Sequence, residues 1–180
     1  MNLFKKIGSE NTTVGLDIGS HSIKLAKIKH LKEDYHLEAV GIKKLEKGVI
    51  ENGVVKKRDE LIEAVTTLIN QCDPSIVDVV ISISGHGILT EKVNFKIEGD
   101  DNIEETILWE AKQRSPFDVD DITLDYKILR EIPDKDELEV LLVAAKDNIM
   151  QGYIDLLYEA GLRPVAVDVD AFAVNNSYAM

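Results

Sequence analysis

The chain has 180 residues, of which 44% are hydrophobic and 30% are charged, and its formal net charge is −12. This length allows one ordinary globular domain, or two small subdomains, with a sizeable core. The acidic excess argues against binding to nucleic acid or directly to anionic lipid. No run reaches the roughly 18 apolar residues of a membrane span, and the N-terminus lacks the apolar core of a signal peptide. With a single cysteine, Cys72, these features predict a cytoplasmic protein.

The first third of the sequence predicts an antiparallel meander followed by a helix. Three apolar stretches, at 13–19, 21–29 and 35–45, are joined by tight turns, as in consecutive antiparallel strands. The apolar residues of the second stretch change parity, which predicts an irregularity near Leu25. An irregular, glycine-punctuated stretch follows at 47–55. The helix is expected to begin at Asp59 as its cap, to run to Cys72 and to end before Pro74.

The rest of the sequence predicts an α/β unit with an insertion. Residues 77–84 form a strand rich in β-branched residues, typical of a parallel sheet with both faces covered. A strand, a helix, a hairpin and a second helix are expected next, at residues 89–97, 102–113 (Asp101 or Asn102 as its start), 122–129 with 138–145, and 147–160. A strand at 164–169 and a helix opened by Asp170 end the sequence. The expected segments are therefore 12–87, an insert at 88–161, and a return at 162–180. Because the last helix has no capping residue, we expect the natural protein to continue beyond Met180.

The stretch with the clearest chemical content is residues 15–24, a glycine turn between two strands. Such a turn lets backbone N–H groups approach phosphate oxygens without interference from a Cβ atom. Asp17 can hold a hydrated Mg²⁺ through water. Ser20 and Ser22 can donate hydroxyl hydrogen bonds, and Lys24 adds a positive charge. A plain hairpin turn with incidental polar residues explains the spacing equally well.

This segment, Gly15-Leu16-Asp17-Ile18-Gly19-Ser20 with Lys24, resembles the first phosphate loop of the superfamily that joins actin, the heat-shock chaperone ATPases and the sugar kinases. The resemblance implies that Asp17, Ser20 and Lys24 contact the metal and the phosphates, with Gly19 at the turn. It also implies that Asp170 positions an attacking water molecule. A plain helix cap or a hinge residue are the other interpretations of Asp170.

Four further segments narrow the resemblance, at 47–53, 110–117, 141–146 and 161–173. Together they are similar to the PilM family, the FtsA-like proteins of type IV pilus machinery, over residues 14–180. The resemblance implies an actin-like (ribonuclease H-like) half-domain, subdomain 1A, with an inserted strand–helix–strand–strand subdomain, 1C. It implies ATP and Mg²⁺ as ligands of the full-length protein. The second phosphate loop and the adenosine pocket are expected beyond residue 180, so a complete ATP site is not expected within these residues.

The resemblance also implies a function. The expected protein is a scaffold, with at most slow ATPase activity, that acts in pilus assembly and twitching motility. It would bind the cytoplasmic N-terminal peptide of the inner-membrane protein PilN in a groove between 1A and 1C, and link the inner-membrane complex to the pilus motors. Membrane contact would come only through such partners. Phe117 is either a core aromatic after the helix stop at Pro116 or a residue that lines the groove.

Two other functions and one property stay open. An ATPase or small-molecule kinase with real turnover is one alternative, although residues 35–45 lack the Asp, Asn and Glu cluster of a sugar-binding loop. The cytoplasmic domain of a type II secretion L protein is the other. Self-association is expected through apolar residues of the last helix, namely Phe172, Val174, Tyr178 and Met180.

Overall fold

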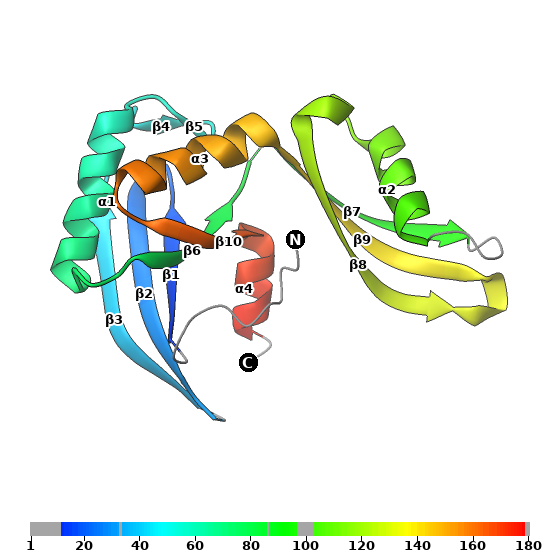
Figure 1. Cartoon of the computed structure of the whole chain (residues 1–180), viewed down its shortest axis with the longest axis horizontal. Helices are drawn as coiled ribbons and strands as arrows, with labels where there is room; N and C mark the ends of the chain where they lie inside the picture. The colour runs from blue at the N-terminus through cyan, green and yellow to red at the C-terminus, as the bar shows by residue number, and fades with distance from the viewer. Residues whose placement is uncertain (1–11, 33, 86, 97–102, 179–180) are drawn as a thin grey trace. The chain divides into compact units, whose positions relative to one another are not determined.

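The computed structural model describes residues 12–32, 34–85, 87–96 and 103–178, which form two compact units (Figure 1). The first unit takes its described residues from 1–85 and 151–180, and the second from 86–150. No helix among these residues is long and apolar enough to cross a membrane.

The first unit is built on a five-stranded sheet in the order β10-β6-β1-β2-β3. Strands β1 (Thr12–Ile18), β2 (Ser22–Leu31) and β3 (Asp34–Lys44) form the predicted antiparallel meander. Strand β6 (Asp78–Ile83) pairs in parallel with both β1 and β10 (Arg163–Val169), which confirms the parallel strand predicted from its composition.

The irregularity predicted near Leu25 was misplaced. Leu25 pairs regularly with Gly41, and the register shift lies between Lys27 and Ile28. The change of apolar parity in β2 has another cause, because the two faces of this strand are covered unequally. Ile23 and Leu25 are fully buried on one face, whereas the residues of the other face are only partly covered.

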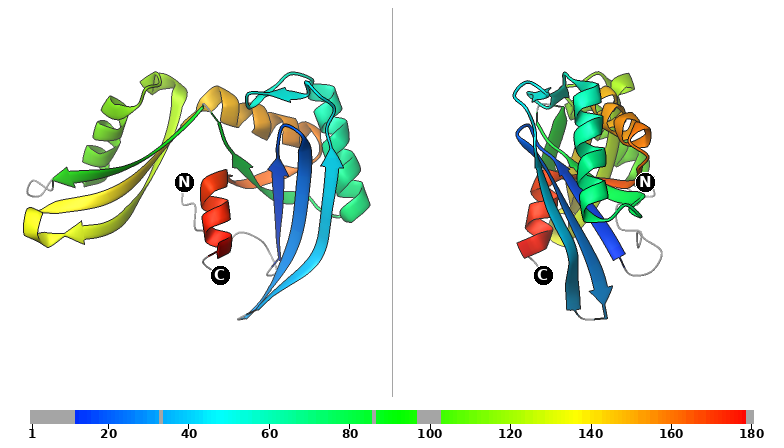
Figure 2. Two further views of the ribbon diagram at one scale, coloured as in Figure 1. Left: turned by 180° about the vertical axis from the view of Figure 1, so that it is seen from behind. Right: turned by 90° about the vertical axis from the view of Figure 1, so that its left-hand side faces the viewer.

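Two helices cover one face of this sheet, and a third lies on the other side (Figure 2). Helix α1 (Arg58–Cys72) packs against β2 and β3, and α3 (Asp147–Glu159) belongs to the first unit from Gln151 onward. Helix α4 (Asp170–Tyr178) packs near β10 and β6 and has no buried residue within its bounds. The core lies between the sheet and α1 and α3, and includes Leu16, Leu25, Leu61, Val65, Leu68, Ile81, Leu156 and Leu157.

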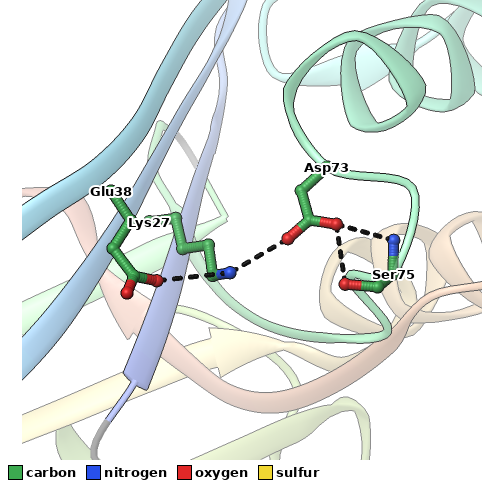
Figure 3. A network of polar contacts seen from close by, with 4 residues as sticks. All are labelled: Lys27, Glu38, Asp73 and Ser75. Carbon is green, nitrogen blue, oxygen red and sulfur yellow. Dashed lines mark hydrogen bonds and ion pairs between the residues drawn. The ribbon is translucent and has the colours of Figure 1, made fainter.

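The two ends of α1 differ in their polar contacts. The predicted cap, Asp59, is wrong: the N-cap is Lys57, which makes no side-chain capping bond, and Asp59 lies in the first turn. At the other end, Asp73 accepts hydrogen bonds from the backbone N–H and the hydroxyl of Ser75. Asp73 also forms an ion pair with Lys27 of β2, and Lys27 forms a second ion pair with Glu38 of β3 (Figure 3). This network ties the end of the helix to two strands of the sheet.

The stretch expected to be irregular contains a short hairpin, β4 (Ile50–Glu51) with β5 (Val54–Val55). Its two turn residues, Asn52 and Gly53, both have positive φ, at 51° and 77°. Asn-Gly is the preferred pair for such a turn, so this hairpin could have been read from the sequence.

The second unit is a three-stranded antiparallel sheet with one helix. Strands β7 (Ile88–Lys96), β8 (Ile122–Ile132) and β9 (Glu137–Lys146) pair in the order β7-β9-β8, and α2 (Ile103–Arg114) precedes β8. Short 3₁₀ turns occur at Val119–Asp121 and Pro133–Lys135. The core joins α2 to the sheet through Val93, Phe95, Ile107, Ala111, Leu138, Val140 and Leu142.

The limits of this unit differ from those of the segment expected at 88–161. Tyr153 donates a hydrogen bond to the carbonyl oxygen of Gly53 at 3.2 Å, and Glu159 forms an ion pair with Arg58 at 2.8 Å. Most of α3 is therefore anchored in the first unit. The expected start of α2 at Asp101 or Asn102 and the end of the last helix at Met180 lie outside the described residues.

Candidate functional site

The predicted phosphate loop is the turn between β1 and β2. The Gly19 N–H donates to the carbonyl oxygen of Ser22 at 3.1 Å. A Cβ atom on Gly19 would lie 3.2 Å from the same oxygen, so the tight turn favours glycine. The Ser20 hydroxyl is exposed and lies 2.8 Å from Nδ1 of His21, and Ser22 is half-buried. The turn thus places the exposed hydroxyl of Ser20 next to the tight backbone turn at Gly19.

Asp17 and Lys24 lie opposite each other on β1 and β2, on the two sides of this turn. Lys24 Nζ is 2.6 Å from a carboxylate oxygen of Asp17, and each side chain is 52% exposed. An ion pair this exposed contributes about 0–1 kcal/mol to stability. Both charges are therefore available to a ligand, the ammonium to a phosphate oxygen and the carboxylate to a hydrated cation.

The strand register extends this pair across the sheet. Asp17 lies opposite Ser82 of β6, and Ser82 lies opposite Asp168 of β10. Opposed residues share a face of the sheet, so Lys24, Asp17, Ser82 and Asp168 form one row, here called the polar row. Gly41, two strands from Asp17 and opposite Leu25, faces α1. Since neighbouring residues along a strand point to opposite faces, the polar row lies on the face away from α1.

The position of the polar row along the strands is that of a ligand site in an α/β sheet. Three of these residues lie one position before the carboxyl end of a parallel strand: Asp17 in β1, Ser82 in β6 and Asp168 in β10. Their side chains therefore gather near the carboxyl ends of the strands, where open α/β sheets bind their ligands.

The two aspartates near the end of β10 have different surroundings. Burial raises the pKa of Asp168, and a hydrogen bond from the Val169 N–H, 2.8 Å long, partly offsets this effect. Asp168 thus lies near the end of its strand and is bonded to the backbone. Asp170 is exposed at the start of α4 and accepts a hydrogen bond from the Ala171 N–H at 2.6 Å. Its roles as cap, hinge or water-positioning residue stay predictions.

The sequence interpretation missed Ser82 as a site residue, because it lies inside the apolar run 77–84. A usable signal was present nonetheless. Three buried strands each carry a polar residue just before their carboxyl end, and the composition of two of them indicates parallel pairing.

The polar row is compatible with magnesium held through water. No group of three or more His, Cys, Asp or Glu side chains that could hold a metal ion occurs within the described part of the chain. Mg²⁺ bound with nucleotide usually keeps several waters and takes only one or two carboxylates, in addition to phosphate oxygens. Asp17 supplies one such carboxylate, beside a turn whose hydroxyl and backbone suit a phosphate group.

The predicted groove residue, Phe117, lies in the second unit. It is half-buried, and its N–H donates to the Ser115 hydroxyl at 3.1 Å. Nζ of Lys146 lies 4.9 Å from the centre of its ring. Phe117 is not a member of the buried core cluster of this unit. Its ring therefore has exposed surface and a cationic neighbour.

Comparison with solved structures supports the fold. A PilM–PilN type IV pilus biogenesis complex contains a chain that is 24% identical, with a TM-score of 0.77, over 89% of this chain and 48% of that one. The cytoplasmic domain of EpsL, an inner-membrane component of the type II secretion system of Vibrio cholerae, is 13% identical with a TM-score of 0.54, over 87% and 57%. The predicted α/β fold is confirmed, because it is shared with both of these solved structures.

The family assignment comes from the sequence itself. The family described as type IV pilus assembly protein PilM matches residues 15–180, which include the glycine turn and the whole polar row. The chain spans about half the length of the PilM structure that it matches. This chain therefore belongs to the PilM family of type IV pilus assembly proteins.

Proposed function

We propose that this chain is the phosphate-binding half of a cytoplasmic scaffold that acts in type IV pilus assembly and is held at the inner membrane by a PilN-type partner. The observation that carries the proposal is the polar row beside the Gly19 turn, in a chain of the PilM family. The row gives the chain the elements of a phosphate and cation site.

The residues of the site would divide the work as follows. The turn at Gly19 and the Ser20 and Ser22 hydroxyls would accommodate phosphate oxygens. Lys24 would exchange its carboxylate partner for a phosphate, which leaves Asp17 free to hold the waters of Mg²⁺. The nucleotide would thus replace an exposed ion pair that contributes little to stability, so binding would not have to disrupt the core.

Turnover of ATP is the second candidate function, and one observation favours it. Burial raises the pKa of Asp168, which lies in the polar row, and a carboxyl group with a raised pKa is a better proton acceptor near neutral pH. Steady-state hydrolysis by the full-length protein and by Asp168→Asn and Asp170→Asn would decide. Activity well above a slow basal rate, lost in either variant, would favour the enzyme.

The partner we propose is the cytoplasmic N-terminal segment of PilN. The matched solved structure is that of a PilM–PilN complex, and the half-buried ring of Phe117 offers an apolar contact of the kind that anchors peptides. Connection to pilus motors and to other inner-membrane proteins is part of the same proposal, as is peripheral localisation at the membrane through these partners.

A peptide-binding experiment tests this function. A fluorescent peptide with the N-terminal sequence of the cognate PilN should bind without nucleotide, at roughly micromolar affinity, about −8 kcal/mol. Phe117→Ala should weaken binding about tenfold or more if the ring anchors the peptide. Leu129→Ala, which truncates another partly exposed apolar side chain of the same unit, is the matched control.

Melting curves of both variants separate a binding defect from a folding defect. A Phe117→Ala variant that melts much earlier but binds normally once folded would show that the ring stabilises the unit instead. Failure of the peptide to bind the well-folded chain would remove the main support for the scaffold.

A further inference from the structure

Strand β3 ends the sheet of the first unit, and within the described residues its outer edge pairs with no other strand. The strand is long for an edge, with 11 residues. An exposed edge of this kind presents unpaired N–H and C=O groups and readily pairs with a strand of another chain.

Four large apolar side chains lie along one face of this edge strand. Gly41 faces α1, because a Cβ atom there would contact Cys72 and Leu68, so its neighbours Val40 and Ile42 lie on the opposite face. Tyr35 and Leu37 lie opposite His30 and Ile28 of β2, beyond the register shift. Because of this shift, they lie on the same face of β3 as Val40 and Ile42. The four are 53–66% exposed: Tyr35, Leu37, Val40 and Ile42. Single exposed apolar residues are ordinary, but a contiguous row indicates an interaction surface.

The sequence of β3 is self-complementary in one antiparallel register. If two copies meet about a two-fold axis between residues 38 and 39, Tyr35 lies opposite Ile42 and Leu37 lies opposite Val40. Each pair occurs twice, and its members share a face of the sheet. All four exposed apolar side chains thus gain cross-strand partners, the contacts that stabilise paired strands.

The charges agree with the same register. Asp34 lies opposite Lys43 of the second copy, again twice. Within the described part of the chain, neither side chain has an ion-pair partner. The two Glu38 carboxylates come near the axis, but each is already paired with Lys27 of its own chain at 3.2 Å (Figure 3). Edge lysines usually oppose strand pairing, whereas here Lys43 meets an acidic residue.

We propose that β3 binds β3 of a second copy in antiparallel register, so that two five-stranded sheets join edge to edge. The complementarity of Asp34 with Lys43 selects a second copy over an unrelated strand. The interface is small, so it should assemble and dissociate with concentration.

Sedimentation velocity over a range of concentrations tests the proposal. The wild-type chain should shift reversibly from monomer to dimer. Val40→Lys should weaken the dimer about tenfold or more, because it sets a lysine opposite Leu37. Val174→Lys, at a similarly exposed apolar residue of α4, tests the sequence-based expectation of self-association through the last helix, and should leave the dimer unchanged. Melting curves confirm that each variant is folded.

A charge exchange tests the register. Asp34→Lys and Lys43→Asp should each weaken the dimer about tenfold, because each replaces two attractions with two repulsions. The double variant Asp34→Lys/Lys43→Asp should restore wild-type association. Three outcomes would each overturn the proposal. The wild-type chain could stay monomeric, Val174→Lys could abolish the dimer, or the double variant could fail to restore association.

Discussion

The two units of this chain use their sheets differently. In the first unit three parallel strands end together, and the last-but-one residue of each contributes to the polar row. In the second unit all three strands are antiparallel, so their ends alternate, and one helix packs against them. Converging parallel ends gather polar groups at one place, whereas an antiparallel sheet distributes them along its length. We therefore expect a phosphate ligand to bind the first unit, and we expect the second unit to contribute mainly a surface for a protein partner.

The means of stabilisation differ as well. Ion pairs between segments distant in sequence fasten the first unit, at Lys27 with Asp73, Arg58 with Glu159, and Arg163 with Asp78. Both units have a buried apolar core, but the ion pairs of the second unit among the described residues, Arg114 with Glu110 and Arg130 with Glu139, join residues close in sequence. The following predictions test this contrast, from the largest expected effect to the smallest.

Matched truncations in the two cores should have the largest effects. Leu61 and Ile107 are almost completely buried in the first and second unit, respectively. Leu61→Ala and Ile107→Ala should each cost about 2–5 kcal/mol of unfolding free energy. Amide exchange should show the loss mainly within the unit that carries the substitution. Equal loss of protection in both units from either variant would contradict two separately cored units.

Acid should destabilise the first unit more than the second. Hydrogen bonds from Ser75 and Lys27 lower the pKa of Asp73, and arginine partners lower that of Asp78 and of Glu159. A carboxyl group with a lowered folded-state pKa stabilises the protein above its ordinary pKa, near 4, and this contribution is lost as the pH falls below that value. All three groups lie in the first unit.

Amide exchange of the two units at pH 6 and at pH 3 measures this effect. The first unit should lose more protection than the second at the lower pH. Glu159 is exposed and Asp73 and Asp78 are half-buried, so solvent screens these ion pairs and the difference should be modest. A larger loss in the second unit would contradict the assignment of these ion pairs.

The sequence predicted the secondary structure correctly where the local hydrophobic pattern agrees with the way the element packs. Alternation predicted the meander, and β-branched composition predicted the parallel strand β6. The tertiary arrangement decided the rest. The periodicity of α3 does not indicate that its residues from Gln151 onward belong to the first unit. Ser82 became a candidate site residue only once its register with Asp17 and Asp168 was known.

A small effect is expected at Asp168. Its pKa is raised by burial, so the ionised form destabilises the fold at neutral pH, and this cost is lost as the pH falls from the raised pKa to the ordinary pKa near 4. Asp168→Asn should therefore raise the stability at pH 7, by about 1 kcal/mol or less, and the gain should vanish in acid. Chemical denaturation at pH 7 and at pH 4 measures both. A variant that is less stable at pH 7 would show that the carboxylate makes a favourable contact.

The most direct test of the central claim, that the polar row binds nucleotide phosphate, is a titration of the isotope-labelled chain with millimolar Mg-ATP followed by NMR. Signals of residues 17–24 and of Ser82 and Asp168 should shift, and those of the second unit should not. Asp17→Ala should abolish the shifts at little cost in stability, whereas Asp134→Ala, an exposed acidic residue of the second unit, should preserve them. Shifts confined to residues 86–150, or shifts that persist in Asp17→Ala, would contradict the account.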